Sequence, residues 1–205
     1  MAGARTLSGA LVPLVSTMPA PTNYKFVAGD YDRKTGLVGD GSTKYLDSNR
    51  AANLDPQNSR HAAVYVSTKT GIGPFLGAAS AGPVYTWMGP GNSPGNDVYV
   101  LNAQSQVAVP RPASLGFYGT SRPSSTNLSY RFGGSTTTVS STSAAHGSET
   151  IEVYKIDRTV VEPPFNYDVY GASRMSFYSI GESLDLDLLD ARVSTLMTEL
   201  DGAIA

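Results

Sequence analysis

A glycine-rich segment, residues 36–43, carries the pattern closest to a catalytic or ligand-binding motif, with the sequence GLVGDGST. Its glycines and its Ser-Thr pair nearly have the spacing of a phosphate-binding loop, in which backbone N–H groups surround a phosphate and a lysine neutralises it. Ser42 stands where that lysine belongs, and Lys44 comes two residues later. The motif also needs a following helix, but residues 44–50 have no helical periodicity. The segment is therefore predicted to be a glycine-rich turn that enters a β-strand.

A second pattern, Gly-X-Ser-X-Gly at residues 91–95, matches the turn that presents the nucleophilic serine of many hydrolases. In that turn the backbone N–H of the residue after the serine helps to bind the oxyanion. Here the residue after Ser93 is Pro94, which has no N–H. The run that follows is typical of a strand instead of a helix. We expect this segment to be a loop.

Carboxylate pairs matter because β-sandwich folds include glycosidases, which use two carboxylates. Glu149 and Glu152 are three residues apart on a predicted strand, so their side chains should point to opposite faces. Asp185 and Asp187 lie at the start of a predicted helix, where residues two apart do not face one site. Neither pair resembles a glycosidase signature.

The remaining candidates for chemistry are two histidines and three loop aspartates. His61 opens a predicted strand and His146 lies in a Ser/Gly-rich turn, so no Ser/His/Asp set can be argued from them. Asp30, Asp32 and Asp40 could contribute oxygen ligands to a calcium site. Isolated loop aspartates are far more often turn formers. We expect no catalytic residues, no metal and no cofactor.

Composition points to an all-β protein with many loops. The chain has 205 residues, of which 40% are hydrophobic and only 16% charged, and it is rich in glycine and other turn-forming residues. A net charge of −2 argues against a nucleic-acid partner. Cysteine is absent, which excludes disulfides and thiolate metal sites. No run of about 18 apolar residues occurs, so we expect no membrane-spanning helix.

Short β-type runs alternate with turn clusters along most of the chain, a spacing typical of a sandwich or barrel. The helix predicted at residues 185–201 has leucine, valine and methionine at helical spacing, with aspartates at its N-terminal end. In the terminal run 174–180, alternation places Met175 and Phe177 on one face. Strands are predicted at residues 61–68, 84–88, 97–102, 114–119, 127–132, 135–139, 150–156 and 174–180.

The first 23 residues are small and apolar and then proline-rich. They resemble a signal peptide superficially, but Pro13 interrupts the apolar stretch, and an N-terminal arm or first strand is the better interpretation. The domain organisation is therefore an arm at 1–23 followed by a sandwich at 24–205 that includes the helix. The candidate anchor or interface side chains of the arm are Leu7, Leu11, Val12, Leu14 and Val15.

Tyrosine is unusually frequent, with 12 residues against 6 phenylalanines and 1 tryptophan. Tyrosine suits positions that have one buried and one wet end. On a sandwich such residues form either a glycan-stacking surface, together with Trp87 and loop asparagines, or an interface between subunits. The sequence alone leaves both interpretations open.

Two segments near the ends of the chain carry a family resemblance. Residues 39–50 (GDGSTKYLDSNR), with 55–58 and 63–68, resemble a module in structural proteins of tailed bacteriophages and prophages. Residues 172–184 (ASRMSFYSIGESL) and the helix after them resemble the same module. The module is a laminin-G-like, concanavalin-A-like jelly roll, and the resemblance covers about residues 7–200. Its motifs contain no catalytic residue.

The resemblance implies a mostly β fold, an antiparallel jelly-roll sandwich with one C-terminal amphipathic helix, in a non-enzymatic protein at the virion surface. Such modules often lie at the tips of long tail proteins, but here no shaft or long heptad region accompanies the module. A capsid decoration or cement protein fits better, with itself (as a homotrimer) and the major capsid or other virion proteins as partners. The alternative is a tail-fibre or adhesin domain that binds host-surface glycan. A glycan hydrolase is a third and weaker hypothesis, because the carboxylate pair that it needs is missing.

Overall fold

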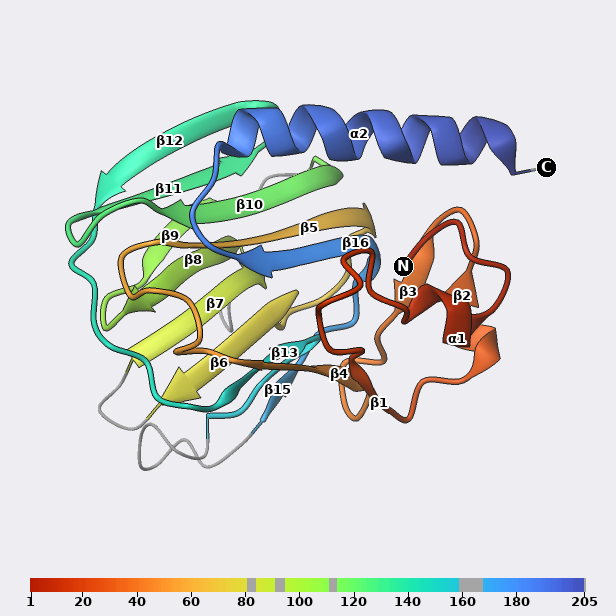
Figure 1. Ribbon diagram of the computed structural model, residues 1–205, viewed down its shortest axis with the longest axis horizontal. Helices are drawn as coiled ribbons and strands as arrows, with labels where there is room; N and C mark the ends of the chain where they lie inside the picture. Colours follow the sequence, from red (N-terminus) through yellow and green to blue (C-terminus); the bar gives the residue numbers. More distant parts are fainter. Residues whose placement is uncertain (81–83, 91–94, 111–113, 159–167, 205) are drawn as a thin grey trace.

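The fold is a β-sandwich with a helix on its outside (Figure 1). A computed structural model describes residues 1–80, 84–90, 95–110, 114–158 and 168–204. Among these residues it has two antiparallel sheets of seven strands each, which face one another as in a jelly roll, and a separate two-stranded ribbon. The predicted class, a mostly β antiparallel sandwich with one C-terminal helix, is confirmed.

Each sheet combines a run of consecutive strands, β6 to β9 in sheet A and β10 to β12 in sheet B, with strands from distant parts of the chain. Sheet A has the order β1 (Thr22–Tyr24), β4 (Tyr45–Ala51), β13 (Thr150–Val153), β6 (Leu76–Ser80), β7 (Val84–Pro90), β8 (Asn96–Ala103) and β9 (Val107–Pro110). Sheet B has the order β12 (Ser135–Ser140), β11 (Asn127–Phe132), β10 (Gly116–Arg122), β5 (Arg60–Thr68), β16 (Arg174–Gly181), β3 (Gly36–Val38) and β2 (Tyr31–Asp32). The ribbon pairs β14 (Lys155–Ile156) with β15 (Val169–Tyr170).

Side chains alternate between the two faces of each strand, and the apolar side chains on the inner faces fill the space between the sheets. In β5, Val64 and Val66 belong to the central core, whereas Ala63 faces the other side of sheet B. Burial of such side chains contributes about 1.5–3 kcal/mol for each Val, Leu, Ile or Phe. The alternation of apolar side chains therefore positions sheet B with one face on the core and one on the helix.

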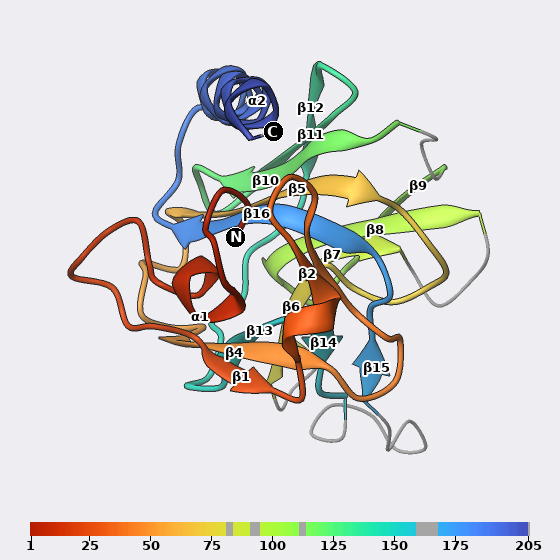
Figure 2. The same cartoon turned by 90° about the vertical axis from the view of Figure 1, so that its right-hand side faces the viewer.

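The C-terminal helix α2 (Leu186–Ala203) covers the outer face of sheet B, on the side away from sheet A (Figure 2). Leu186 and Val193, buried on one side of the helix, pack against Ala63 and Phe117. Asp185 is the N-cap, and its carboxylate accepts hydrogen bonds from the backbone N–H groups of residues 187 and 188 at 2.8 and 3.0 Å. The predicted helix at 185–201 is confirmed, and it extends two residues further.

Most predicted strands are present, but two details of the prediction were wrong. The run 150–156 is not one strand, because Tyr154 has φ = 71° and separates β13 from β14. Met175 and Phe177 do not share a face: a register shift lies between them, so Met175 enters the core while Phe177 packs on the helix side. β6 and β9 were not predicted, and neither were several short elements, namely β1, β2, β3, β15, α1 (Leu7–Ala10) and the 3-10 turn η1 (Ala28–Asp30).

No helix in the described ranges combines the length and the apolar composition needed to cross a lipid bilayer.

Candidate functional site

The N-terminal arm is held against the sandwich by backbone hydrogen bonds. The N–H of Ala2 donates to the carbonyl of Ser176 at 2.8 Å, which lies at the irregularity in β16. The N–H of Gly3 donates to the carbonyl of Arg33 at 2.7 Å, and the hydroxyl of Tyr31 donates to the carbonyl of Ala4 at 2.8 Å. The arm therefore follows a defined path along one side of the sandwich, and α1 lies beside β16 and β4 (Figure 2).

The five predicted anchor residues fall into two groups. Leu7 and Leu11 are partly buried and pack against the core of the sandwich. Val12, Leu14 and Val15 point outward, with 65%, 83% and 58% of their surface exposed. The first two residues attach the arm to its own domain, and the last three form a contiguous apolar surface, here called the arm tip.

Beneath the arm tip lies a cavity of about 280 Å³ between the arm, β4 and β16. Val12, Leu14 and Val15 are part of its wall, which is mostly apolar but also includes Ser48, Arg50 and Ser179. The lining residues include Leu11, Leu14, Met18, Pro21, Tyr178 and Ile180. Contiguous exposed apolar surface of this kind marks interaction sites in soluble proteins.

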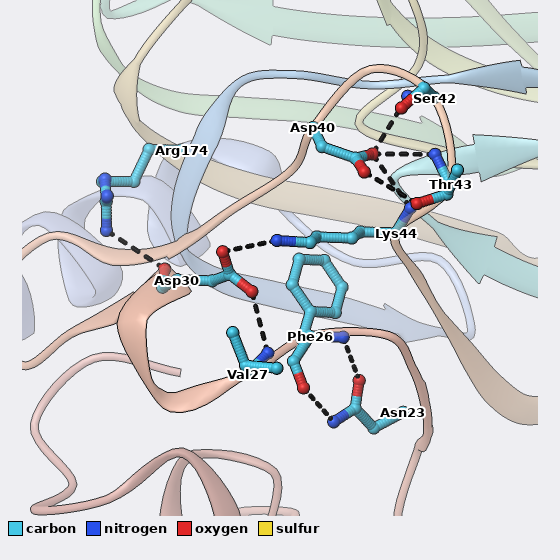
Figure 3. Close-up of polar contacts among 9 residues, drawn as sticks. All are labelled: Asn23, Phe26, Val27, Asp30, Asp40, Ser42, Thr43, Lys44 and Arg174. Atoms are coloured by element: carbon cyan, nitrogen blue, oxygen red, sulfur yellow. Dashed lines mark hydrogen bonds and ion pairs between the residues drawn. The ribbon is translucent and has the colours of Figure 1, made fainter.

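The glycine-rich segment is a closed turn instead of a phosphate site (Figure 3). One carboxylate oxygen of Asp40 accepts the backbone N–H groups of Ser42, Thr43 and Lys44 at 3.0, 2.8 and 2.9 Å. The ammonium of Lys44 pairs with Asp30 at 2.6 Å. A phosphate would need the same N–H groups and the same lysine. The strand β4 follows directly, so the predicted turn into a strand is confirmed for residues 39–44, whereas Gly36–Val38, expected in the turn, form β3.

The three loop aspartates act as turn formers. Burial favours the neutral form of Asp40, but the backbone N–H groups of Thr43, Lys44 and Ser42 outweigh it and hold the pKa of this carboxyl well below its usual range. Asp32 accepts the backbone N–H groups of residues 34 and 35 at 2.9 and 2.8 Å. Asp30 accepts the N–H of Val27 at 2.8 Å in addition to its bond with Lys44. Within the described residues no three His, Cys, Asp or Glu side chains form a group that could hold a metal ion.

A serine, a histidine and a glutamate meet in one place that the sequence did not indicate. The hydroxyl of Ser80 lies 2.6 Å from His146 Nδ1, donates to Glu149 at 2.7 Å and accepts the N–H of Gly147 at 2.8 Å. In a catalytic triad the carboxylate contacts the ring nitrogen opposite the serine. Here Glu149 lies on the same side, 3.8 Å from Nδ1. The arrangement ties the 146–149 loop to the end of β6.

The two histidines are built into this framework. Burial lowers the pKa of His146 to about 4. Burial also lowers the pKa of His61, whose ring nitrogens contact the carbonyl of Glu182 at 2.6 Å and the hydroxyl of Ser179 at 2.8 Å. Both imidazole rings are therefore neutral near pH 7, and their hydrogen bonds hold parts of the fold together. The serine pattern at residues 91–95 cannot be compared with them, because residues 91–94 lie outside the described residues.

Three tyrosines gather where β1, β4 and β15 meet. Tyr24 and Tyr45 are cross-strand partners, and their rings stack with centroids 4.3 Å apart and an interplanar angle of 3°. Tyr170 lies edge-on to Tyr45 at 6.2 Å. The ammonium of Lys155 lies 4.6 Å from the centroid of the Tyr45 ring. By contrast, Trp87, which was expected to join a glycan-binding surface, is only 2% exposed in β7 and is not available for this role.

Lys155 is held by two carboxylates from different elements. Its ammonium contacts Glu152 at 3.1 Å and Asp168 at 3.3 Å. Burial raises the pKa of Glu152 to about 7, because desolvation of this carboxyl outweighs the attraction of the ammonium. Asp185 and Asp187, the other carboxylate pair, are the cap of α2 and a partner of Arg131. The cluster of Tyr45, Lys155, Asp168 and Tyr170 therefore combines aromatic rings with an ion pair, and sequence spacing did not reveal it.

No protein-family model matches the chain, and no curated protein matches it either.

Proposed function

We propose that the protein is a non-enzymatic structural protein of a bacteriophage particle, specifically a capsid decoration or cement protein. The virion context comes from the resemblance of residues 39–68 and 172–184 to modules of phage structural proteins. The observation that carries the proposal is the arm tip, which exposes Val12, Leu14 and Val15 next to an apolar cavity. A decoration protein needs such a surface to attach to neighbouring subunits.

Attachment would bury the arm tip against a capsid protein or a second copy of this chain in a trimer. Each fully buried leucine or valine contributes about 1.5–3 kcal/mol from removal of its surface from water. Leu7 and Leu11 already fix the arm on the sandwich, so little ordering of the chain would oppose binding. The role is mechanical: the buried contacts hold adjacent subunits together against internal pressure.

The test uses the full chain with Val12→Ser, Leu14→Ser and Val15→Ser together. Removal of residues 1–20 would also remove Leu7 and Leu11 from the core, so it would confuse loss of folding with loss of binding. Co-sedimentation with undecorated particles should show at least about tenfold weaker binding, since the lost burial exceeds 1.4 kcal/mol. Thermal unfolding should be nearly unchanged.

The matched control is a second triple variant, Leu54→Ser, Leu115→Ser and Leu188→Ser. These side chains are 62%, 54% and 57% exposed at other places on the surface. This variant should bind particles as the unaltered protein does. Equal binding by both triple variants would contradict the proposed anchor.

A second candidate function is a tail-fibre or adhesin domain that binds host-surface glycan. The observation in its favour is the tyrosine cluster, where the Tyr24 ring is 40% exposed and stacks on Tyr45. Aromatic rings at a wet surface are suited to stacking on sugars. Immunogold labelling of intact particles distinguishes the two candidates, since a decoration protein labels the head and an adhesin labels the tail.

A further inference from the structure

A pocket of about 480 Å³ lies beside the tyrosine cluster, between the loops after β3 and β5 and strand β15. Small-molecule sites usually measure about 300–1,000 Å³. The wall includes two glycines with φ near +70°, Gly41 and Gly71, and both approach the methyl group of Ala172. Ile72 adds an exposed apolar side chain, and Tyr170 and Asp168 add an aromatic ring and a carboxylate.

The aromatic ring and the carboxylate are fixed relative to each other. The hydroxyl of Tyr170 donates to Asp168 Oδ2 at 3.0 Å, and the ammonium of Lys155 contacts the same oxygen at 3.3 Å. Lys155 is in turn positioned by Glu152 and by the ring of Tyr45. A ligand in the pocket would therefore meet groups that are already ordered, which lowers the free-energy cost of binding.

One oxygen of this carboxylate lacks a hydrogen bond. Asp168 Oδ1 is buried and has no partner among the described residues. A buried acceptor without a hydrogen bond destabilises the folded state. Asp168 lines the pocket, so a hydrogen-bond donor bound there would lie against this carboxylate. A hydroxyl group is such a donor.

The charges select the kind of ligand. One ammonium, from Lys155, faces two carboxylates, from Glu152 and Asp168. The ammonium is already paired, and Asp168 is the only charged side chain among the described residues of the pocket wall, so its carboxylate would repel an anionic ligand. An uncharged ligand that donates hydroxyl hydrogen bonds and presents C–H groups to the negative face of an aromatic ring fits the pocket.

We propose that this pocket binds an uncharged pyranose sugar, with Asp168 accepting hydroxyl groups and Tyr170 contacting the apolar face of the sugar ring. The pocket shares no lining residue with the cavity at the arm tip, and sugar binding there does not require attachment to a capsid. Failure of sugar binding and failure of particle binding are therefore separate results.

Saturation-transfer NMR and amide chemical-shift titration of the full chain test the proposal. The probes are the methyl glycosides of galactose, glucose and mannose, with N-acetylneuraminic acid as the anionic comparison. We expect at least one neutral glycoside to bind in the millimolar range, with shifts at Gly41, Gly71 and Ala172. Asp168→Ala and Tyr170→Ala should each weaken this binding at least about tenfold, as expected for loss of a hydrogen bond to a charged group or of an aromatic contact.

Two controls keep the result specific. Asp201→Asn removes a carboxylate that is exposed on α2 and should not change binding. The second variant, Tyr24→Ala, separates this pocket from the tyrosine surface of the adhesin candidate: sugar held in the pocket should stay bound within about twofold, because the Tyr24 ring is not part of the pocket wall. Circular dichroism and thermal unfolding show whether each variant is folded.

Three outcomes would overturn the proposal. The first is that no neutral glycoside binds at about 100 mM, far above a millimolar Kd, and the second is that N-acetylneuraminic acid binds more tightly than every neutral glycoside. The third is that binding is lost in Tyr24→Ala and kept in Asp168→Ala. The last result would place the sugar on the exposed Tyr24 ring instead of in the pocket.

Discussion

The two terminal segments of the chain both pack on the sandwich, but they differ in how much of their apolar side-chain surface is buried. The helix α2 places Leu186 and Val193 against sheet B, and its exposed leucines, Leu188 and Leu196, are scattered singly along the helix. The arm buries only part of its apolar surface and leaves Val12, Leu14 and Val15 together in solvent. Single exposed leucines are ordinary, whereas a contiguous group is not.

The two terminal segments therefore differ in how firmly they are packed on the sandwich. Helix α2 covers apolar side chains on the outer face of sheet B and should contribute to the stability of the fold. The arm is held by a few hydrogen bonds and two half-buried leucines, so its outer residues are free to contact another molecule. Substitutions that separate stability from attachment test this distinction.

The largest expected effect comes from Leu186→Ala. Leu186 is 3% exposed and packs between α2 and sheet B, so its truncation leaves a cavity and should cost about 3 kcal/mol of unfolding free energy. Urea unfolding followed by circular dichroism measures this loss. Leu188→Ala, two residues away and 57% exposed, should cost less than about 0.5 kcal/mol. Similar losses for both variants would show that the helix is not stabilised by its inner face.

A medium effect is expected at the N-caps of the two helices. Asp185→Ala removes the acceptor of two backbone N–H groups in an 18-residue helix and should cost about 1 kcal/mol. Thr6→Ala removes one hydrogen bond of 3.2 Å at the start of the four-residue helix α1, and should cost only about 0.5 kcal/mol. The same urea series compares the two. A larger loss for Thr6→Ala would indicate that the arm is part of the stable core.

The smallest effect on stability is expected at the arm tip. Leu14→Ser changes a side chain that is 83% exposed, so the unfolding free energy should stay within about 0.5 kcal/mol of the original value. The melting temperature of the purified variant checks this. A clear loss of stability would show that Leu14 packs within its own domain, which would contradict the proposal that it is part of an attachment surface.

The sequence predicted the strands and the helix where the apolar period was regular. Residues 127–132 were predicted as a strand and form β11, and the helix begins beside its aspartate cap as expected. The prediction was wrong where a local backbone irregularity interrupted the alternation of side chains along a strand. These places are the register shift between Met175 and Phe177 and the positive φ of Tyr154. Strand β6 was missed because small residues, Gly77 and Ala78, give it no alternating pattern.

The candidate sites were predictable only in part, for a related reason. The arm could be identified from its apolar composition, but the division between Leu11, which packs inward, and Leu14, which points outward, depends on where the chain meets β16. The turn role of Asp40 was predictable because its partners are two to four residues away. Trp87 was expected at a binding surface, but the arrangement of sheet A buries it.

The fold class, the absence of disulfides, the C-terminal helix and the turn around Asp40 could be read from the amino-acid sequence, because each depends on composition or on contacts between near neighbours. Which side chains meet across the molecule depends on the tertiary structure. Tyr45, Lys155 and Tyr170 are more than a hundred residues apart at the extremes, and Ser80 and His146 are separated by 66 positions. These groups meet because the strands of each sheet come from distant parts of the chain, so their proximity follows from strand order and register instead of from any local pattern.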